Sequence, residues 1–360
     1  MVRLLSFIFS LLLFSINAFA QENSTFKVGV ILPLTGAVAE YGVATKNGIE
    51  LAKKEHPELF SKVQFIYDDS QYEGKKALSG FQKLKNSDGV SLVYIWGYGP
   101  VQAVAPVAET DRFPVIAVSA ERSISLNRKY TLRFGYHIEM IANSLLDYFR
   151  AHSIKHVGIV KTELAYMNGL LDAIKKNLKS DETMDIVDTY QPSDTDFKTT
   201  ITKLRTKKFD AVGVFLIGGQ ISQFYRQSKQ LDLKLNTFGT DAFDSMKEAQ
   251  DAQGAMTGAV FIAPYADSGF VQRYVKTFGN DLQAAWAANG YEYALLTAKL
   301  FGEKQEKLTA DQILERYKSS DKEQGETATY KFNESPEGSG FDFKVVARKI
   351  EADKIVDITK

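Results

Sequence analysis

The sequence contains no cysteine, and this absence excludes three kinds of chemistry at once. A chain without thiols has no disulfide scaffold, no thiolate metal site and no cysteine nucleophile. Its 360 residues must therefore be stabilised by burial of ordinary side chains. Since this length exceeds what one hydrophobic core usually supports, the sequence predicts two lobes.

Neither sign of charge is in excess, because lysine plus arginine number 44 and aspartate plus glutamate also number 44. A protein that holds nucleic acid or an anionic membrane by electrostatics needs a basic surplus. We therefore expect no nucleic-acid partner. The sequence also lacks the serine elbow, the zinc-protease helix and the phosphate loop, which lowers the expectation of an enzyme.

Long apolar runs are missing except at the N-terminus, where residues 4–16 are almost entirely apolar. A charged start precedes this run, and Ala18 and Ala20 end it in an Ala-x-Ala pattern. These features predict a secretory signal peptide at residues 1–20. The apolar run is short for a membrane span, and the alternative is an uncleaved anchor. Gln21 follows where a lipid anchor would require cysteine. We therefore expect a periplasmic protein.

Short apolar runs alternate with longer amphipathic runs through the rest of the chain, which is typical of parallel sheets covered by helices on both faces. The expected strands are residues 27–32, 63–67, 91–95, 113–118, 156–161, 184–190, 209–216, 236–240 and 259–263. The expected helices are residues 43–56, 74–84, 101–110, 196–207, 222–231, 284–302 and 309–319. Residues 325–332 and 340–350 read as two antiparallel strands beside the second lobe.

An internal repeat supports two similar halves. Tyr41 precedes an Asn-Gly pair in the first half, and Tyr166 precedes another in the second. In both halves we expect the tyrosine in the loop between a strand and a helix, and this shared order favours a duplicated α/β unit.

The loops after the predicted strands are the expected ligand site, because doubly wound sheets bind ligands at the carboxyl ends of their strands. Trp96, Gly97, Tyr98 and Gly99 follow one strand, and their glycines and rings suit the wall of a pocket. The alternative is a tight turn with Tyr98 as a lid.

The next such loop contains Ser119, Ala120, Glu121 and Arg122. Glu121 is suited to an ammonium group and Arg122 to an acid. The alternative is that the two charges pair with each other or face water.

In the second half, Ile217, Asp241, Phe243 and Tyr265 also follow strands. Asp241 is placed to hold a ligand ammonium group, and a helix cap is its alternative role. Asp68 and Asp69 are read as loop and cap residues rather than metal ligands. No histidine cluster is evident, so we expect no metal and no cofactor.

The sequence resembles the branched-chain amino-acid binding proteins, the type I periplasmic receptors of ABC importers. The resemblance rests on residues 27–48 (KVGVILPLTGAVAEYGVATKNG), 67–69, 105–109, 114–120, 195–197, 290–293 and 341–343. It implies two Rossmann-like α/β lobes joined by a three-segment hinge, with residues 25–138 and 265–325 in one lobe and 139–264 and 326–360 in the other. It also implies that Tyr41 and Tyr166 flank the cleft and that Asp241 meets an ammonium group.

Three departures from that family's pattern affect the expected ligand. Tyr98 and its glycines stand where many members carry serines, Glu121 and Arg122 stand where many carry small residues or threonine, and Ile217 replaces a tyrosine of some members. They predict a ligand other than a simple branched-chain amino acid.

The leading hypothesis is a monomeric solute receptor that captures an amino acid, or a related small organic acid or amide, for the membrane permease of an ABC importer. The alternative is a periplasmic sensor on the same scaffold that signals to a membrane partner. A hydrolase is the third possibility, with Ser119 and Glu121 as its best available pair.

Overall fold

The computed structural model describes residues 25–234, 236–303, 307–320, 325, 327–328, 330–335, 338–352 and 354–358. The expected signal peptide lies outside these residues. Within the described part of the chain, no helix combines the length and apolar character needed to span a membrane.

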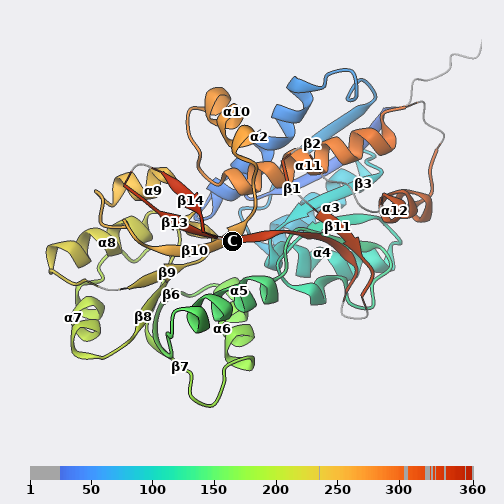
Figure 1. Cartoon of the computed structure of the whole chain (residues 1–360). Coiled ribbons are helices and arrows are strands. Elements are labelled where there is room, and N and C mark those ends of the chain that lie inside the picture. The colour runs from blue at the N-terminus through green and yellow to red at the C-terminus, as the bar shows by residue number, and fades with distance from the viewer. Residues whose placement is uncertain are drawn as a thin grey trace, which may run out of the picture.

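The described residues form two lobes, each built on a seven-stranded sheet (Figure 1). The first sheet has the order β11-β12-β5-β4-β3-β1-β2. Its strands are β1 (Phe26–Leu32), β2 (Val63–Asp69), β3 (Leu92–Trp96), β4 (Val115–Val118), β5 (Thr131–Phe134), β11 (Tyr330–Asn333) and β12 (Gly340–Phe343). All adjacent pairs are parallel except β11 with β12.

Helices cover both faces of this sheet, as its apolar strands require. The first-lobe helices are α2 (Ala39–Glu55), α3 (Gly74–Asn86), α4 (Tyr98–Thr110), α10 (Ser268–Phe278), α11 (Ala284–Phe301) and α12 (Ala310–Ser319). Along β1, Val28, Val30 and Leu32 join the core formed with α2 and α11, whereas Ile31 joins the core formed with α3 and α4. This alternation buries both faces of the strand.

The second sheet has the order β14-β13-β10-β9-β8-β6-β7. Its strands are β6 (His156–Thr162), β7 (Thr183–Tyr190), β8 (Ala211–Phe215), β9 (Thr237–Gly239), β10 (Val260–Pro264), β13 (Val345–Ile350) and β14 (Ile355–Asp357). Its helices are α5 (Ile138–Ala151), α6 (Ala165–Lys176), α7 (Lys198–Thr206), α8 (Gln220–Gln230) and α9 (Met246–Asp251). Strands β6 to β10 pair in parallel, and β13 and β14 add antiparallel partners at one edge.

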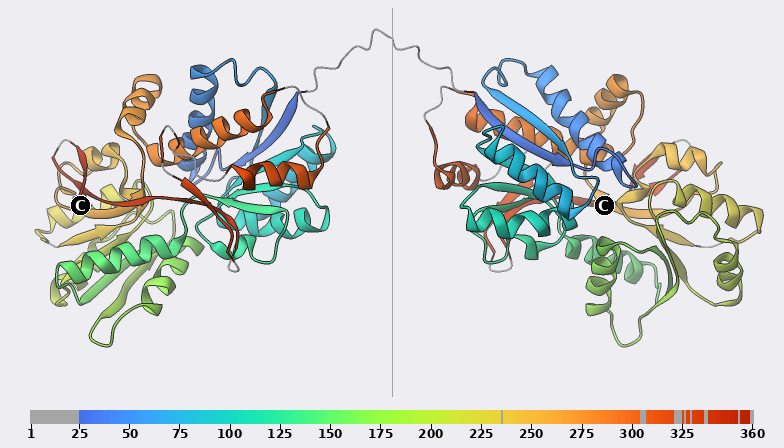
Figure 2. Two further views of the ribbon diagram at one scale, coloured as in Figure 1. Left: turned by 45° about the vertical axis from the view of Figure 1, so that its right-hand side comes forward. Right: turned by 180° about the vertical axis from the view of Figure 1, so that it is seen from behind.

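Three short segments cross between the lobes. Residues 135–137 connect β5 to α5, residues 265–267 connect β10 to α10, and Lys344 connects β12 to β13. The second and third crossings lie side by side, since the Tyr265 amide donates to the Lys344 carbonyl at 2.9 Å. Both views of Figure 2 show the two lobes meeting at these segments.

The third crossing differs from the expected one, which lay between residues 325 and 326. Strands β11 and β12 belong to the first sheet, and the single strand expected at residues 340–350 is divided at Lys344. Phe341 and Phe343 pack their rings on Phe134 of β5, with centroid distances of 5.2 and 5.0 Å. Aromatic packing and strand pairing with β5 therefore hold this segment in the first lobe.

Four elements, β5, α5, α10 and β14, were not predicted. Strand β5 is short and has Arg133 at its centre, a residue that rarely occurs in a buried strand. Arg133 is fully buried because Asp342 and the carbonyl of Gly135 accept its hydrogen bonds. Helix α5 did carry a signal, because its buried apolar residues recur at helical spacing.

Candidate ligand-binding site

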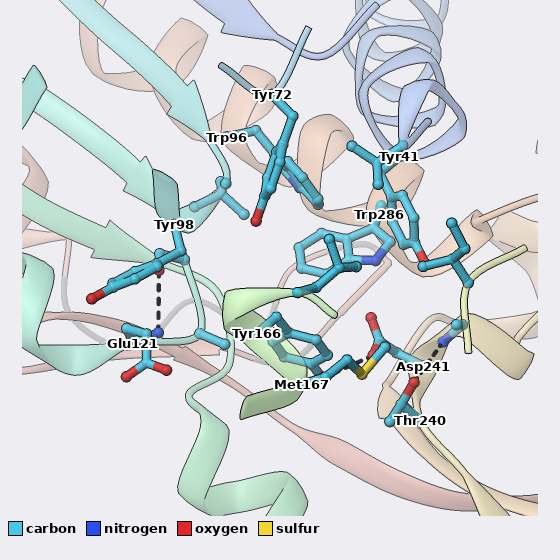
Figure 3. A pocket seen from close by; sticks show the side chains of 18 of the residues that line it. Tyr41, Tyr72, Trp96, Tyr98, Glu121, Tyr166, Met167, Thr240, Asp241 and Trp286 are labelled. Carbon is cyan, nitrogen blue, oxygen red and sulfur yellow. Dashed lines mark hydrogen bonds between the residues drawn. The ribbon is translucent and has the colours of Figure 1, made fainter. Parts of the chain in front are cut away.

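The site is a cavity of about 70 Å³ between the two lobes (Figure 3). Its lining residues are Val38, Tyr41, Tyr72, Trp96, Gly97, Tyr98, Val118, Ser119, Ala120, Glu121, Tyr136, Leu164, Tyr166, Met167, Ile217, Thr240, Asp241, Ala242 and Trp286. A dry cavity of about 150 Å³ accepts benzene, so this space holds only a few heavy atoms unless side chains or lobes move.

Aromatic rings from five separate parts of the chain form one wall. Trp96, the last residue of β3, stacks with Tyr41 of α2 at a centroid distance of 5.4 Å. Trp286, in the first turn of α11, meets Trp96 edge-on at 5.3 Å and lies 5.6 Å from Tyr136 of the first crossing. Tyr72 completes this group at 5.9 Å from Trp96. These contacts fix the rings against one another.

Asp241 is the buried carboxylate on the second-lobe side. The hydroxyl of Tyr166 donates to its Oδ1 at 2.9 Å, and the hydroxyl of Tyr136 donates to its Oδ2 at 3.3 Å. Burial raises the pKa of Asp241 to about 6, and the hydrogen bonds from the Tyr166 and Tyr136 hydroxyls oppose that rise. Asp241 is therefore mostly ionised at pH 7.

The capping role considered for Asp241 is wrong. The side chain of Ser245, not Asp241, accepts a hydrogen bond from the Glu248 amide at the start of α9. Thr240 caps the short 3-10 helix Asp241–Phe243 by accepting from the Ala242 amide at 3.4 Å. The Asp241 carboxylate is thus left facing the cavity.

Glu121 and Tyr98 lie together at the other end of the cavity (Figure 3). The Glu121 amide donates to the Ser119 hydroxyl at 3.2 Å, which shapes the loop after β4. Burial raises the pKa of the Glu121 carboxyl, and the nearby charges of Glu139 and Asp172 raise it further. Glu121 therefore adds a second acidic group to the lining.

The structure brings ten of the predicted residues to this cavity: Tyr41, Trp96, Gly97, Tyr98, Ser119, Ala120, Glu121, Tyr166, Ile217 and Asp241. Gly97 has a φ of +100°, and a Cβ there would approach the Tyr72 ring to 2.4 Å. Glycine at this position is therefore required by both the backbone conformation and the ring beside it.

Four predicted residues do not line the cavity. Gly99 lies in the first turn of α4, and Arg122 begins the 3-10 helix Arg122–Ser125. Phe243 is buried in the second-lobe core beneath Gly239, and Tyr265 lies in the second crossing with the Lys344 ammonium 5.4 Å from its ring. All four follow strands in sequence, but none of them borders the cavity.

The two neighbouring aspartates that end β2 do not form a metal site. Asp69 accepts hydrogen bonds from the Leu34 and Gln71 amides and the Thr35 hydroxyl, and these bonds lower its pKa although burial acts to raise it. Neither aspartate caps α3, whose N-cap is Glu73, so that part of the prediction is wrong. Within the described residues no cluster of acidic residues and histidines could hold a metal ion.

The comparison with known proteins agrees with this geometry. Residues 25–337 match the family model described as periplasmic binding protein. The chain belongs to the periplasmic binding protein family. It is 28% identical over 270 residues to the Leu/Ile/Val-binding protein BraC3 of Rhizobium johnstonii, covering 68% of this chain and 69% of that protein. The resemblance to branched-chain amino-acid binding proteins is thereby confirmed.

Solved structures show the same two-lobed fold. The leucine-binding protein LivK of Thermotoga maritima superposes with a TM-score of 0.77 at 19% identity, covering 93% of this chain and 98% of that one. A solute-binding protein of an R. palustris ABC transporter, in complex with benzoate, has a TM-score of 0.75 at 17% identity, with coverages of 93% and 96%. The expected fold of two α/β lobes is thus confirmed.

In this periplasmic binding protein, sequence reasoning missed nine lining residues: Val38, Tyr72, Val118, Tyr136, Leu164, Met167, Thr240, Ala242 and Trp286. Tyr72 had a signal, because it follows β2 at the carboxyl edge of the sheet. Tyr136 lies in a crossing and Trp286 on a helix distant in sequence, so the rule of strand ends does not select them.

Proposed function

We propose that this protein captures a small ligand between its lobes in the periplasm and delivers it to the membrane permease of an ABC importer. The observation that carries the proposal is a cavity lined by side chains of both lobes, with aromatic rings mainly from the first and Asp241 from the second. The relatives named above as amino-acid and solute-binding proteins support the same role.

A ligand in this cavity would favour closure of the lobes, because the lining residues come from both of them. A ligand that touches Trp96 and Asp241 together stabilises the closed arrangement only, because an open cleft separates the two lobes. The three short crossings are the segments about which the lobes would rotate. The permease would then distinguish the closed, loaded form from the open one.

Intrinsic fluorescence is a direct test, since the chain has only two tryptophans and both line the cavity. We expect a bound ligand to change the emission of Trp96 or Trp286 and to raise the melting temperature. A ligand at 100 times its dissociation constant stabilises the native state by about 2.7 kcal/mol.

Single Trp96→Phe and Trp286→Phe variants assign the emission change to one indole. A matched control is Tyr148→Phe, which alters an aromatic residue of α5 outside both the cavity and the crossings. If a broad panel of small amines, acids, amides and amino acids changes neither emission nor melting temperature, the receptor role is refuted.

A further inference from the structure

The charges that line the cavity are all of one sign. Asp241 and Glu121 are its only ionisable side chains apart from tyrosine, and none of the described lining residues is lysine, arginine or histidine. Charges in a partly buried site are poorly screened by water, so this arrangement attracts a cation and repels an anion. A ligand carboxylate would enter without any opposite charge to receive it.

Asp241 is held in place without being neutralised. The hydroxyls of Tyr136 and Tyr166 donate to its two oxygens, and neither donor carries a charge. A carboxylate offers about four acceptor positions, so the two bonds leave capacity for a further donor. An ammonium group is the donor that also supplies the missing charge.

The walls of the cavity are mainly aromatic and aliphatic, which also suits an organic cation. Seven of the lining residues are tyrosine or tryptophan, and four more are valine, leucine or isoleucine. Aromatic faces attract alkylammonium groups, and this attraction is stronger where water is excluded. The aliphatic side chains bury the apolar body of the same ligand.

The remaining hydrogen-bond donors in the cavity are neutral. The indole nitrogen of Trp96 is buried and makes no hydrogen bond to any described residue. The Ser119 hydroxyl already accepts from the Glu121 amide and lies on the same loop as the Glu121 carboxyl. These groups suit a hydroxyl or carbonyl oxygen of the ligand better than a carboxylate.

We propose that the ligand is a small organic cation, an amine or quaternary ammonium compound with a compact apolar body and no carboxylate. This inference rests on the proposed receptor function and specifies its ligand class. Asp241 binds the ammonium group, the rings of Trp96, Trp286 and Tyr41 surround it, and Glu121 excludes anionic and zwitterionic compounds from the far end.

Four compounds that share a 3-methylbutyl group test the charge requirement. They are 3-methylbutylamine, 4-methylpentanoate, 4-methylpentanamide and leucine, titrated calorimetrically into the full mature protein after unfolding and refolding to remove bound ligand. Tetramethylammonium and choline extend the cationic set, and glycine and acetate extend the others. We expect a cation to bind at least roughly 100-fold more tightly than any anion, amide or zwitterion.

The outcomes separate the inference from the function on which it rests. If leucine, the acid or the amide binds tightly and no cation binds with comparable affinity, the cation proposal is overturned and the receptor function stands. Absence of binding by every compound, together with no small molecule in mass spectra of the freshly purified protein, refutes both. Release of an amine from the purified protein supports both.

Asp241→Asn removes the charge and keeps a side chain of the same size. We expect it to weaken binding of the cation by roughly 30-fold or more without improving that of the amide. Asp185→Asn is the control, because it removes an exposed carboxylate from the same lobe outside the cavity. Equal affinities of the two variants for the cation would contradict the role of Asp241, and the wild-type titrations stand even if Asp241→Asn folds poorly.

Discussion

Helices α2 and α11 pack so closely that adding a single methyl group between them is expected to destabilise the protein. A Cβ added at Gly48 would lie 1.8 Å from the carbonyl oxygen of Ala287, and one added at Gly290 would lie 2.2 Å from that of Thr45. The two glycines therefore permit a backbone approach that no other residue allows. We predict that Gly48→Ala destabilises the first lobe.

The expected magnitude is the difference between two opposing effects. Alanine in a helix interior is favoured over glycine by about 1 kcal/mol. Ordinary contact begins near 3.4 Å, so the Ala287 carbonyl must retreat by about 1.6 Å, and a backbone group cannot rotate aside. Overpacking of this kind costs about 3 kcal/mol or more, which leaves a net loss of roughly 2 kcal/mol.

Ligand binding should weaken in the same variant. Tyr41 and Trp286 each lie in the first turn of one of these two helices, with ring centroids 6.3 Å apart. Separation of the helices therefore moves two walls of the cavity relative to each other. A second effect of Gly48→Ala would thus be a lower affinity for whichever ligand the wild-type protein binds.

Thermal and urea unfolding measure the change in stability, with an expected fall in melting temperature of roughly 4–8 °C. Gly99→Ala is the matched control, since a Cβ there has nothing within 4 Å and the residue lies in the first turn of α4. We expect this control to be neutral or slightly stabilising. A Gly48→Ala protein as stable as the control would refute the inference that this helix contact depends on glycine.

Two further predictions concern buried charges. Burial, with the nearby Glu248 carboxylate, raises the pKa of Glu40 from 4.5 to about 7, so the folded state retains a proton that the unfolded state loses between these values. Glu40→Gln should therefore leave the free energy of unfolding unchanged at pH 4 and raise it by about 1–2 kcal/mol above pH 7. Urea unfolding at a series of pH values measures this, and a difference between variant and wild type that does not change with pH would contradict it. Asp342→Ala leaves the fully buried Arg133 without its ion-pair partner and should lower the free energy of unfolding in urea by about 3 kcal/mol. A loss below about 1 kcal/mol would show that the carbonyl of Gly135 alone stabilises the buried guanidinium.

The alternation of apolar and amphipathic runs was sufficient to predict two α/β lobes, because a strand buried on both faces and the helix that covers it each leave a local pattern. Many strands and helices lie close to their expected positions. The carboxyl ends of β3 and β4 could be identified in the same way, and the residues there, Trp96, Tyr98, Ser119 and Glu121, line the cavity.

The sequence by itself determined the fold class and half of the cavity wall, since these depend on periodicity and on the direction of parallel strands. Tertiary structure alone decided that β12 pairs with β5, and that Tyr136 and Trp286 line the same cavity as Asp241. These relations join residues more than 40 positions apart through packing that no local pattern encodes. The tertiary structure also decided that the cavity carries negative charge only, because Glu121 of the first lobe and Asp241 of the second are far apart in the sequence.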